Sequence, residues 1–492
     1  MMKHAPNTLR IVLALATVAT VFFGIAAVAL NFDSTAGEPP VAANTSSTTQ
    51  VSPPSSTPGS SQGPASSPTT KVTSPDTIES AGPSLRGVGA PNPSSSTSSS
   101  APASTTPRST DTKPKPATTQ PKPTTTQPAP PTTQTPPPQG VPDGAVVVNP
   151  GENIQRLVDR HPAGTTFYLR AGVHHAPGGT RHIDPKRGNT FLGEPGAILD
   201  GGGSTTYAFQ DNGGANDVTI RGLEIRNYRN PAERGAIDAS RSGWRVIQCN
   251  VHSNSGAGIN FRGNNWTIEG SNIHHNAQIG ILGSGSGGRV VNNTIANNNP
   301  NRAYDWNWEA GGTKFVKTSG LRVSGNKVLN NNGPGLWTDG SNTGTLYEGN
   351  VVRDNAGPGI FHEISGSATI RNNTVSGNAH KFYVGGILVA NSSDVTVTGN
   401  TVSGNDGGII GLQDNRSPNT VNLTVTGNHV SHSGGVSGLV YNGGTDVAST
   451  GSIRFDGNSY SVGGGRPFSW KGGSLTVDEW KAIGQDVNSS FN

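Results

Sequence analysis

Residues 319–365 read SGLRVSGNKVLNNNGPGLWTDGSNTGTLYEGNVVRDNAGPGIFHEIS, and the two halves of this stretch have the same pattern. Asn326 aligns with Asn350 and Gly335 with Gly359, so the repeat is 24 residues long. A period of this length is typical of a solenoid, in which each coil buries its apolar side chains only against its neighbours. Short apolar alternations between Gly and Asn, such as Val395-Thr396-Val397, predict strands and turns rather than helices.

Two asparagines of the repeat recur far beyond this stretch. The first series is Asn293, Asn326, Asn350, Asn373, Asn400, Asn428 and Asn458, and the second is Asn254, Asn276, Asn298, Asn331, Asn355, Asn378 and Asn405. Asparagine tolerates the left-handed backbone region, and its amide can bond the backbone of the next coil. We therefore predict two asparagine ladders at the turns. Cys249, the single cysteine, replaces the asparagine of the first series in its coil, so we expect a buried structural thiol.

This pattern resembles the right-handed parallel β-helix of the pectate-lyase-like superfamily, over residues 141–492. The resemblance implies an all-β solenoid of about ten or eleven coils. The phrases GENIQRLVD and GTTFYLRAGVHH also resemble the N-terminal cap of exported actinobacterial β-helix proteins. Apolar spacing predicts a capping helix over 152–160, and Thr476 with Glu479 forms a capping-box pattern for a second helix. With both ends closed we expect a monomer.

The N-terminal part of the chain has a different composition. Residues 11–30 are uncharged and follow two basic residues, Lys3 and Arg10, so segment 1–36 is expected to be an apolar helix, either a membrane anchor or a cleaved signal peptide. Residues 37–140 are rich in Pro, Ser and Thr, which predicts a disordered stalk. Together they predict export, with the β-helix domain at the cell surface or outside the cell, and membrane contact only through the apolar segment.

The formal net charge is +4. We interpret the basic pI as scarcity of charge rather than as a basic stripe, so nucleic acid is not an expected partner.

Candidate chemistry lies on the strand that follows the repeat's glycine. Side chains alternate along a strand, so the second and fourth residues after the glycine are expected to face outward. These positions hold Lys314, Trp337 with Asp339, Phe361 with Glu363, and, two coils before Lys314, Arg262. Equivalent positions on adjacent coils stack, which puts the Asp339 and Glu363 carboxyl groups roughly 5 Å apart. His362 falls on an inward position, where a buried, hydrogen-bonded histidine is expected, although it also joins the candidate binding residues.

Two insertions leave the same edge of the predicted solenoid. The first, residues 299–311, carries Tyr304, Trp306, Trp308 and Glu309. The second, residues 379–385, carries Phe382 and Tyr383. Such insertions commonly build a binding face, and we expect them to form the walls of a groove with Trp337 in its floor. Indole and phenol rings suit the apolar faces of sugars.

Three interpretations of this groove stay open. In the first, Asp339 and Glu363 are the acid and the nucleophile or base of a glycosidase. In the second, Asp339, Glu363 and Glu309 bind Ca²⁺, and Lys314 or Arg262 removes a proton from a uronic acid in a lyase reaction. In the third, the two carboxylates are solvated surface groups. No cofactor other than Ca²⁺ is expected.

The family resemblance implies activity on carbohydrate without choosing the reaction. The chain lacks the Asn-Thr-Asp, Asp-Asp and Gly-His-Gly set of the polygalacturonase-like hydrolases and the D-P-N-D motif of the mannuronan epimerases. We therefore predict a polysaccharide lyase or glycoside hydrolase acting on an acidic or cell-wall glycan. The candidate catalytic residues are Asp339, Glu363 and Lys314, and the candidate binding residues are Trp337, Trp306, Trp308, Glu309, Arg262, Phe361 and His362. The alternative is a non-catalytic carbohydrate-binding or adhesion module; a purely structural wall protein is expected if Trp306 and Trp308 close the groove.

Overall fold

The computed structural model describes residues 140–175, 182–380 and 385–492. The expected apolar segment and stalk lie outside the described residues. Among the residues that are described, no helix has the length and apolar character needed to cross a membrane.

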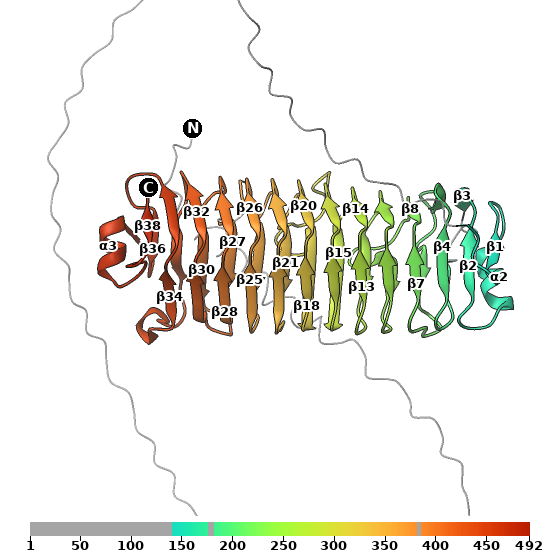
Figure 1. Ribbon diagram of the computed structural model, residues 1–492, viewed down its shortest axis with the longest axis horizontal. Helices are drawn as coiled ribbons and strands as arrows, with labels where there is room; N and C mark the ends of the chain where they lie inside the picture. The colour runs from blue at the N-terminus through green and yellow to red at the C-terminus, as the bar shows by residue number, and fades with distance from the viewer. Residues whose placement is uncertain (1–139, 176–181, 381–384) are drawn as a thin grey trace, which may run out of the picture. The chain divides into compact units, whose positions relative to one another are not determined.

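Three long sheets run along the solenoid, and each coil contributes one strand to each of them (Figure 1). Sheet A consists of β1 (Val146–Val148), β2 (Thr166–Leu169), β4 (Thr190–Gly193), β7 (Thr219–Arg221), β10 (Arg245–Ile247), β13 (Thr267–Glu269), β16 (Arg289–Val291), β19 (Arg322–Ser324), β22 (Thr345–Glu348), β25 (Ala368–Arg371), β28 (Ser393–Thr398), β31 (Val421–Thr426) and β34 (Ile453–Asp456). Sheet B consists of β3 (Gly172–His175), β5 (Ala197–Asp200), β8 (Glu224–Arg226), β11 (Asn250–His252), β14 (Asn272–His274), β17 (Thr294–Ala296), β20 (Lys327–Leu329), β23 (Val351–Arg353), β26 (Thr374–Ser376), β29 (Thr401–Ser403), β32 (His429–His432), β35 (Ser459–Val462) and β38 (Ser490–Phe491).

Sheet C carries the candidate site. It consists of β6 (Phe209–Gln210), β9 (Gly235–Ala239), β12 (Ala257–Phe261), β15 (Ile279–Ser286), β18 (Gly311–Ser319), β21 (Leu336–Asp339), β24 (Ile360–Glu363), β27 (Ile387–Ala390), β30 (Ile409–Asp414), β33 (Ser437–Asn442), β36 (Phe468–Trp470) and β37 (Gly473–Leu475). Strands of successive coils pair in parallel, as β21 does with β24, and the final pair, β36 with β37, is antiparallel. The predicted all-β parallel solenoid is confirmed.

Both asparagine ladders are present and explain why the coils keep register. The Asn326 backbone N–H donates to Asn350 Oδ1 over 3.0 Å, and the Asn326 Nδ2 donates to the same oxygen over 2.9 Å. The backbone N–H and the Nδ2 of Asn350 in turn both donate to Asn373 Oδ1. The amide also bonds backwards, since Asn350 Nδ2 donates to the Val323 carbonyl. Each buried turn therefore has its polar groups satisfied by the neighbouring coils, which burial requires.

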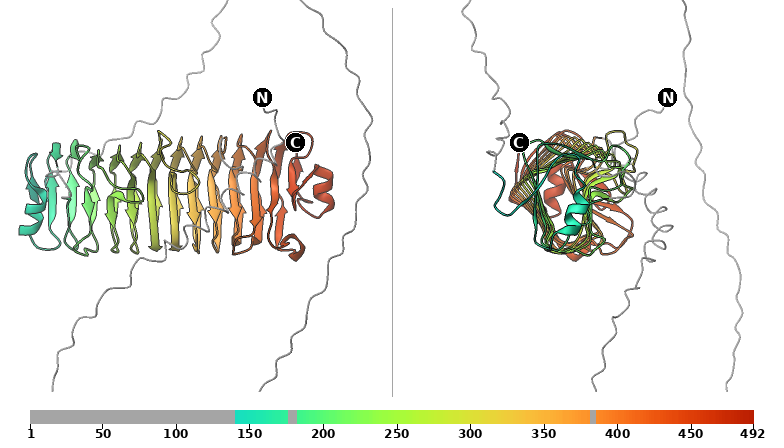
Figure 2. Two further views of the ribbon diagram at one scale, coloured as in Figure 1. Left: turned by 180° about the vertical axis from the view of Figure 1, so that it is seen from behind. Right: turned by 90° about the vertical axis from the view of Figure 1, so that its right-hand side faces the viewer.

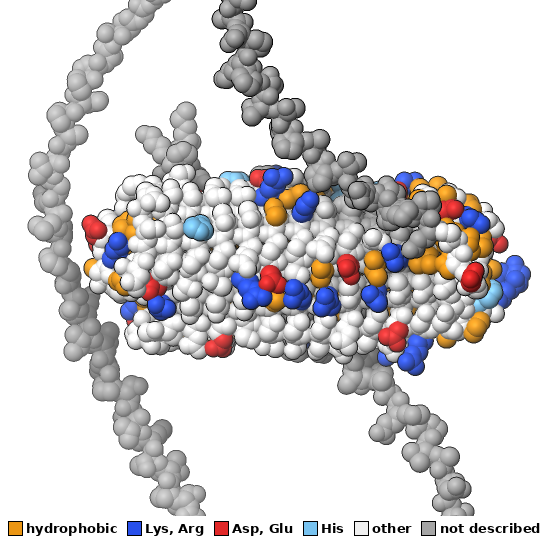
Figure 3. All heavy atoms as spheres, in the orientation of Figure 1, with side chains coloured by type: hydrophobic (Ala, Val, Ile, Leu, Met, Phe, Trp, Pro, Cys, Tyr) orange, Lys and Arg blue, Asp and Glu red, His pale blue; other side chains and the backbone are white. Residues whose placement is uncertain are grey.

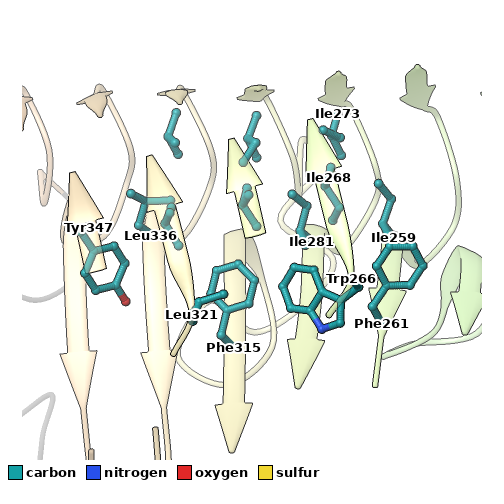
Figure 4. Packing of buried hydrophobic residues seen from close by; sticks show 14 of the residues in the cluster. Ile259, Phe261, Trp266, Ile268, Ile273, Ile281, Phe315, Leu321, Leu336 and Tyr347 are labelled. Atoms are coloured by element: carbon teal, nitrogen blue, oxygen red, sulfur yellow. The ribbon is translucent and has the colours of Figure 1, made fainter. Parts of the chain in front are cut away.

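The interior of the solenoid is filled by stacked apolar side chains (Figure 4). On sheet C, Ile259 pairs with Ile281, and Leu336 pairs with Ile360. In the same core the ring of Trp266 stacks on Phe315 and lies tilted against Phe261. Cys249 is buried and free, as expected.

A short helix lies at each end of the coils. At the N-terminal end, α2 (Ile154–Arg160) buries Ile154 and Val158, and the end-on view shows it lying across the opening (Figure 2). It begins two residues later than predicted because Asn153 caps it, accepting from the Arg156 N–H. At the other end, α3 (Val477–Ala482) begins with the predicted capping box of Thr476 and Glu479.

Candidate functional site

Register on sheet C assembles the predicted side chains from three successive strands. Trp337 of β21 pairs with Phe361 of β24, and Asp339 pairs with Glu363. The neighbouring strand β18 is aligned so that Phe315 pairs with Thr338, which puts Lys314 level with Trp337. The two predicted outward columns therefore exist.

Lys314 and Asp339 form one half of the site. Lys314 Nζ lies 2.9 Å from Asp339 Oδ2. The same ammonium lies 4.0 Å from the ring centroid of Trp337 and 4.7 Å from that of Trp308, and it donates a hydrogen bond to the Trp308 carbonyl. The ammonium is therefore surrounded by a carboxylate, two indole faces and a carbonyl.

Glu363 forms the other half, with a cation that the sequence analysis missed. Its Oε1 accepts from Arg416 Nη1 over 2.5 Å, and its Oε2 accepts from Trp337 Nε1 over 3.0 Å. Arg416 Nε in turn donates to Asp414 Oδ2 over 2.8 Å. We call Lys314, Asp339, Glu363, Arg416 and Asp414 the charged row.

The pKa values of carboxyl groups near this row are perturbed. Burial raises the pKa of Glu363 to about 7, although the Arg416 guanidinium opposes the shift, while the Asp339 carboxylate adds to it. Burial also raises the pKa of Glu309, together with the nearby charges of Glu233 and Asp305. Burial and the Asp339 charge therefore favour the protonated form of Glu363, and the Arg416 guanidinium opposes it.

The expected open floor is wrong, because the outward columns are covered. Trp337, Phe361 and Glu363 are each 2% exposed, and Lys314 and Asp339 are 7% and 8% exposed. The rings of Trp337 and Phe361 stack on each other, 5.5 Å apart and 9° from parallel. They are part of a second apolar cluster on the outer face of sheet C, which continues through Leu388, Ala390, Ile410, Leu412 and Val440. Alternation predicted correctly that these side chains leave the core, but it does not report what covers them.

His362 lies inside the coil, so its expected contact with a ligand is also wrong. It is fully buried, its Nε2 lies 2.8 Å from the Gly366 carbonyl, and its Nδ1 lies 2.7 Å from Thr338 Oγ1. A carbonyl only accepts, so Nε2 carries the proton and Nδ1 accepts from Thr338, whose hydroxyl oxygen accepts from Tyr347. Burial lowers the pKa of His362 to about 4.

We expect His362 to make the protein acid-sensitive. Its folded pKa of about 4 lies below the ordinary 6.5, so its contribution to stability is present above pH 6.5 and is lost as the pH falls through 4. A His362→Gln variant cannot titrate. Between pH 7 and pH 4 the native protein should therefore lose roughly 3 kcal/mol more unfolding free energy than this variant. Urea unfolding at both pH values measures the difference; equal losses contradict the neutral, buried assignment.

The first insertion is docked against earlier coils. The Tyr304 hydroxyl donates to the Ser255 carbonyl over 3.0 Å, and Gln278 Nε2 donates to Glu309 Oε2 over 2.9 Å. Trp308 contacts Lys314 from this segment, and Trp306 is half-buried within it. The insertion therefore covers the Lys314 end of the charged row through Trp308. In the second insertion, Phe382 and Tyr383 lie outside the described residues.

Arg262 does not join the charged row. It donates from Nη2 to Asp238 Oδ1 over 2.8 Å, and Arg234 lies 3.2 Å from the same oxygen. Its coil is three coils from that of Asp339, about 14 Å along the solenoid. Arg262 as a base acting beside Asp339 is therefore wrong.

The carboxylates expected to share Ca²⁺ have other partners. Asp339 is paired with Lys314 and Glu363 with Arg416, while Glu309 accepts from Gln278. In the described part of the chain, no group of three or more His, Cys, Asp or Glu side chains is placed to hold a metal ion. The expected calcium site at Asp339, Glu363 and Glu309 is therefore not formed by these side chains.

Arg416 and Asp414 come from the opposite edge of sheet C, where β30 turns toward sheet A. Arg416 is 53 residues from Glu363 in sequence. The sequence DNRSPN, residues 414–419, could have indicated these two residues. Its acidic Asp414 and basic Arg416 stand just before the turn at Pro418. The two insertions predicted as walls lie at the other edge, where sheet B turns into sheet C.

Comparison with known proteins agrees with this architecture. The model of the family "Right handed beta helix region" matches residues 235–385, the segment from β9 to β26. The chain is a right-handed parallel β-helix protein. XylC in complex with xylose is a solved structure similar to this β-helix, with a TM-score of 0.50 and 11% identity over 69% of this chain and 82% of XylC.

Two further solved structures are similar at lower scores. The A-module of the mannuronan C-5 epimerase AlgE4 from Azotobacter vinelandii has a TM-score of 0.41 and 17% identity, covering 71% of this chain and 97% of the module. A PL6 alginate lyase in complex with a trisaccharide has a TM-score of 0.45 and 12% identity, covering 71% and 89%. No curated protein matches the sequence. At these identities the likeness shows the fold alone.

Proposed function

We propose that this β-helix protein hydrolyses glycosidic bonds in a polysaccharide, with Asp339 and Glu363 as the catalytic pair. The observation that carries the proposal is the difference between two neighbouring carboxyl groups. Asp339 Oδ2 is 2.9 Å from the Lys314 ammonium, whereas burial raises the pKa of Glu363 to about 7. Two adjacent carboxyl groups in contrasting environments are the arrangement that acid and nucleophile roles require.

The roles follow from these environments. Protonated Glu363 gives its proton to the oxygen of the leaving sugar, while the Asp339 carboxylate attacks the anomeric carbon and forms a glycosyl-enzyme. Glu363 then removes a proton from the water that releases the sugar. Positions on adjacent coils are about 4.8 Å apart, close to the ~5–5.5 Å separation of retaining enzymes. The product is therefore expected to keep the anomeric configuration of the substrate.

Lyase chemistry based on Lys314 is less well supported. A base must reach the proton that it removes, yet Lys314 is enclosed by Asp339, the Trp308 carbonyl and the faces of Trp308 and Trp337. These contacts leave Lys314 only 7% exposed. In the proposed mechanism Lys314 positions the Asp339 carboxylate.

Substrate entry requires the covered site to open. Trp308 contacts Lys314 from one edge of sheet C, and Arg416 contacts Glu363 from the other. At least these two side chains must move before a sugar reaches both carboxyl groups. Trp306 and Trp308 then offer ring faces on which sugars can stack, whereas the Trp337 ring is covered by Phe361 and Lys314.

The same burial favours a second, non-catalytic candidate, either a carbohydrate-binding or adhesion module or the structural wall protein expected where Trp308 closes the groove over Lys314. Glu363 and Trp337 are each 2% exposed, and both Asp339 and Glu363 form ion pairs. Such buried pairs also fit a row that stabilises the solenoid. In this alternative the charged row holds the coils together, and glycan binds elsewhere.

From the composition of the N-terminal part of the chain we also propose where the protein acts. An apolar segment at 11–30 followed by a Pro-, Ser- and Thr-rich stretch over 37–140 supports export, with the β-helix presented at the cell surface.

Incubation of the purified protein with a panel of uronate and neutral glycans tests the proposal. We expect new reducing ends without the ultraviolet absorbance of an unsaturated uronate, because hydrolysis leaves no double bond. Unsaturated products would assign a lyase instead. Binding without any product would favour the adhesion module.

A further inference from the structure

We propose that the outer face of sheet A is a second binding surface, which takes an anionic polysaccharide such as a polyuronate. It is formed by Arg221, Arg245, Arg289, Arg322 and Arg371, which we call the arginine row. This surface lies on a different sheet from the charged row and does not depend on the proposed catalytic function.

Register brings these arginines into two adjacent columns. Arg245 and Arg289 both pair with Thr267, from opposite sides, and Arg289 pairs directly with Arg322. In the neighbouring column Arg221 pairs with Ile247, and Arg371 pairs with Glu348. Equivalent positions repeat at about 4.8 Å per coil, so Arg245, Arg289 and Arg322 recur along one line, while Arg221 and Arg371 lie beyond its two ends in the neighbouring column.

The row carries much of the protein's excess charge. From β7 to β25, the outward positions of sheet A hold five arginines and two acids, Glu269 and Glu348. This leaves an excess of three positive charges, whereas the whole chain has a formal net charge of +4. Figure 3 shows basic side chains gathered in a row along the solenoid, with mostly uncharged surface around them on that face. The expectation that the chain has no basic stripe is therefore wrong.

The arginines are available to a ligand. Arg245 and Arg289 are exposed, and neither makes an ion pair within the described residues. The Arg322 and Arg371 side chains are 43% and 45% exposed. Glu348 holds both of them, accepting from Arg322 Nη2 and from Arg371 Nε over 2.8 Å each, which fixes the two side chains while leaving other N–H groups free to bind.

The spacing and composition favour an extended polyuronate. A linear polyuronate carries one carboxylate on each sugar, and a guanidinium binds carboxylate through two parallel hydrogen bonds. Single-stranded nucleic acid needs aromatic platforms for its bases, and no aromatic side chain occupies an outward position of sheet A between β7 and β25. The apolar neighbours on these columns are Ile247, Val291 and Leu346, which suit the C–H faces of sugars.

Binding of the full chain to sodium polygalacturonate, followed as a function of salt, tests the proposal. The Arg245→Glu/Arg289→Glu variant should bind about tenfold more weakly or worse, because two charge-assisted contacts are lost, and its affinity should depend less on salt. The control, Lys327→Glu/Arg353→Glu, reverses two exposed charges on sheet B and should bind like the native protein.

Other variants separate this surface from the proposed catalytic site. Asp339→Asn/Glu363→Gln should keep polygalacturonate affinity, whatever its effect on glycan cleavage. Equal weakening in the sheet A and sheet B variants, or no salt-sensitive binding by the native chain, overturns the proposal. Tighter binding to single-stranded polynucleotide than to polygalacturonate overturns the assigned ligand class. Circular dichroism confirms that each variant is folded.

Discussion

Glu363→Gln should lower the rate of glycan cleavage by about 10³-fold, because the amide cannot donate the proton that the leaving sugar needs. The pH profile gives a second readout. With a pKa of about 7, native Glu363 is protonated below neutral pH, so cleavage should fall as the pH rises through 7. Because folding raises the pKa of Glu363 from 4.5 to about 7, protonation of Glu363 adds to the free energy of unfolding below pH 4.5. This contribution is lost as the pH rises through 7.

A matched control for this variant lies on sheet B. Glu224 of β8 also accepts a hydrogen bond from an arginine, with Arg226 Nη1 2.6 Å from its Oε1, but it belongs neither to the charged row nor to the arginine row. Glu224→Gln should leave the cleavage rate within about twofold of the native value. Comparable loss in both variants, or full activity in Glu363→Gln, contradicts the assignment of Glu363 as the acid.

Asn350→Ala should lower the unfolding free energy by roughly 4 kcal/mol. The substitution removes the acceptor of the Asn326 N–H and Nδ2 and the donor to the Val323 carbonyl. These groups are buried, and a buried polar group without a partner costs about 1–3 kcal/mol. Urea unfolding measures the total, and hydrogen exchange should show the loss of protection centred on β20 and β23.

The control for the ladder is an asparagine that does not belong to it. Asn272 is exposed, and its side chain donates a single hydrogen bond, to Asn250 Oδ1 over 3.1 Å. Asn272→Ala should cost less than about 0.5 kcal/mol. If Asn350→Ala is no more destabilising than Asn272→Ala, the ladders do not hold the coils in register.

The sequence predicted the parts of this protein that follow from repetition. A period of 24 residues between Asn326 and Asn350 is enough to place Asp339 beside Glu363, since equivalent residues of stacked coils must be neighbours. The capping box at Thr476 was predictable for a similar reason, because both of its residues lie within one helical turn.

What escaped prediction depends on contacts between unrelated segments. Alternation shows that Trp337 leaves the core, but its burial depends on what covers sheet C. Arg416 reaches Glu363 from a turn 53 residues away, and no local pattern fixes where that side chain ends. The arginine row was hidden for another reason: its members are far apart in sequence and differ in position within the repeat, so they align only when the register of sheet A is known.

The structure of a crystal soaked with an acidic oligosaccharide tests the central claim most directly. We expect sugar over β18, β21 and β24, within hydrogen-bonding distance of Asp339 and Glu363, with Trp308 and Arg416 displaced from Lys314 and Glu363. Sugar bound only along the outer face of sheet A, above a charged row that stays closed, would contradict catalysis by this row and leave a binding module.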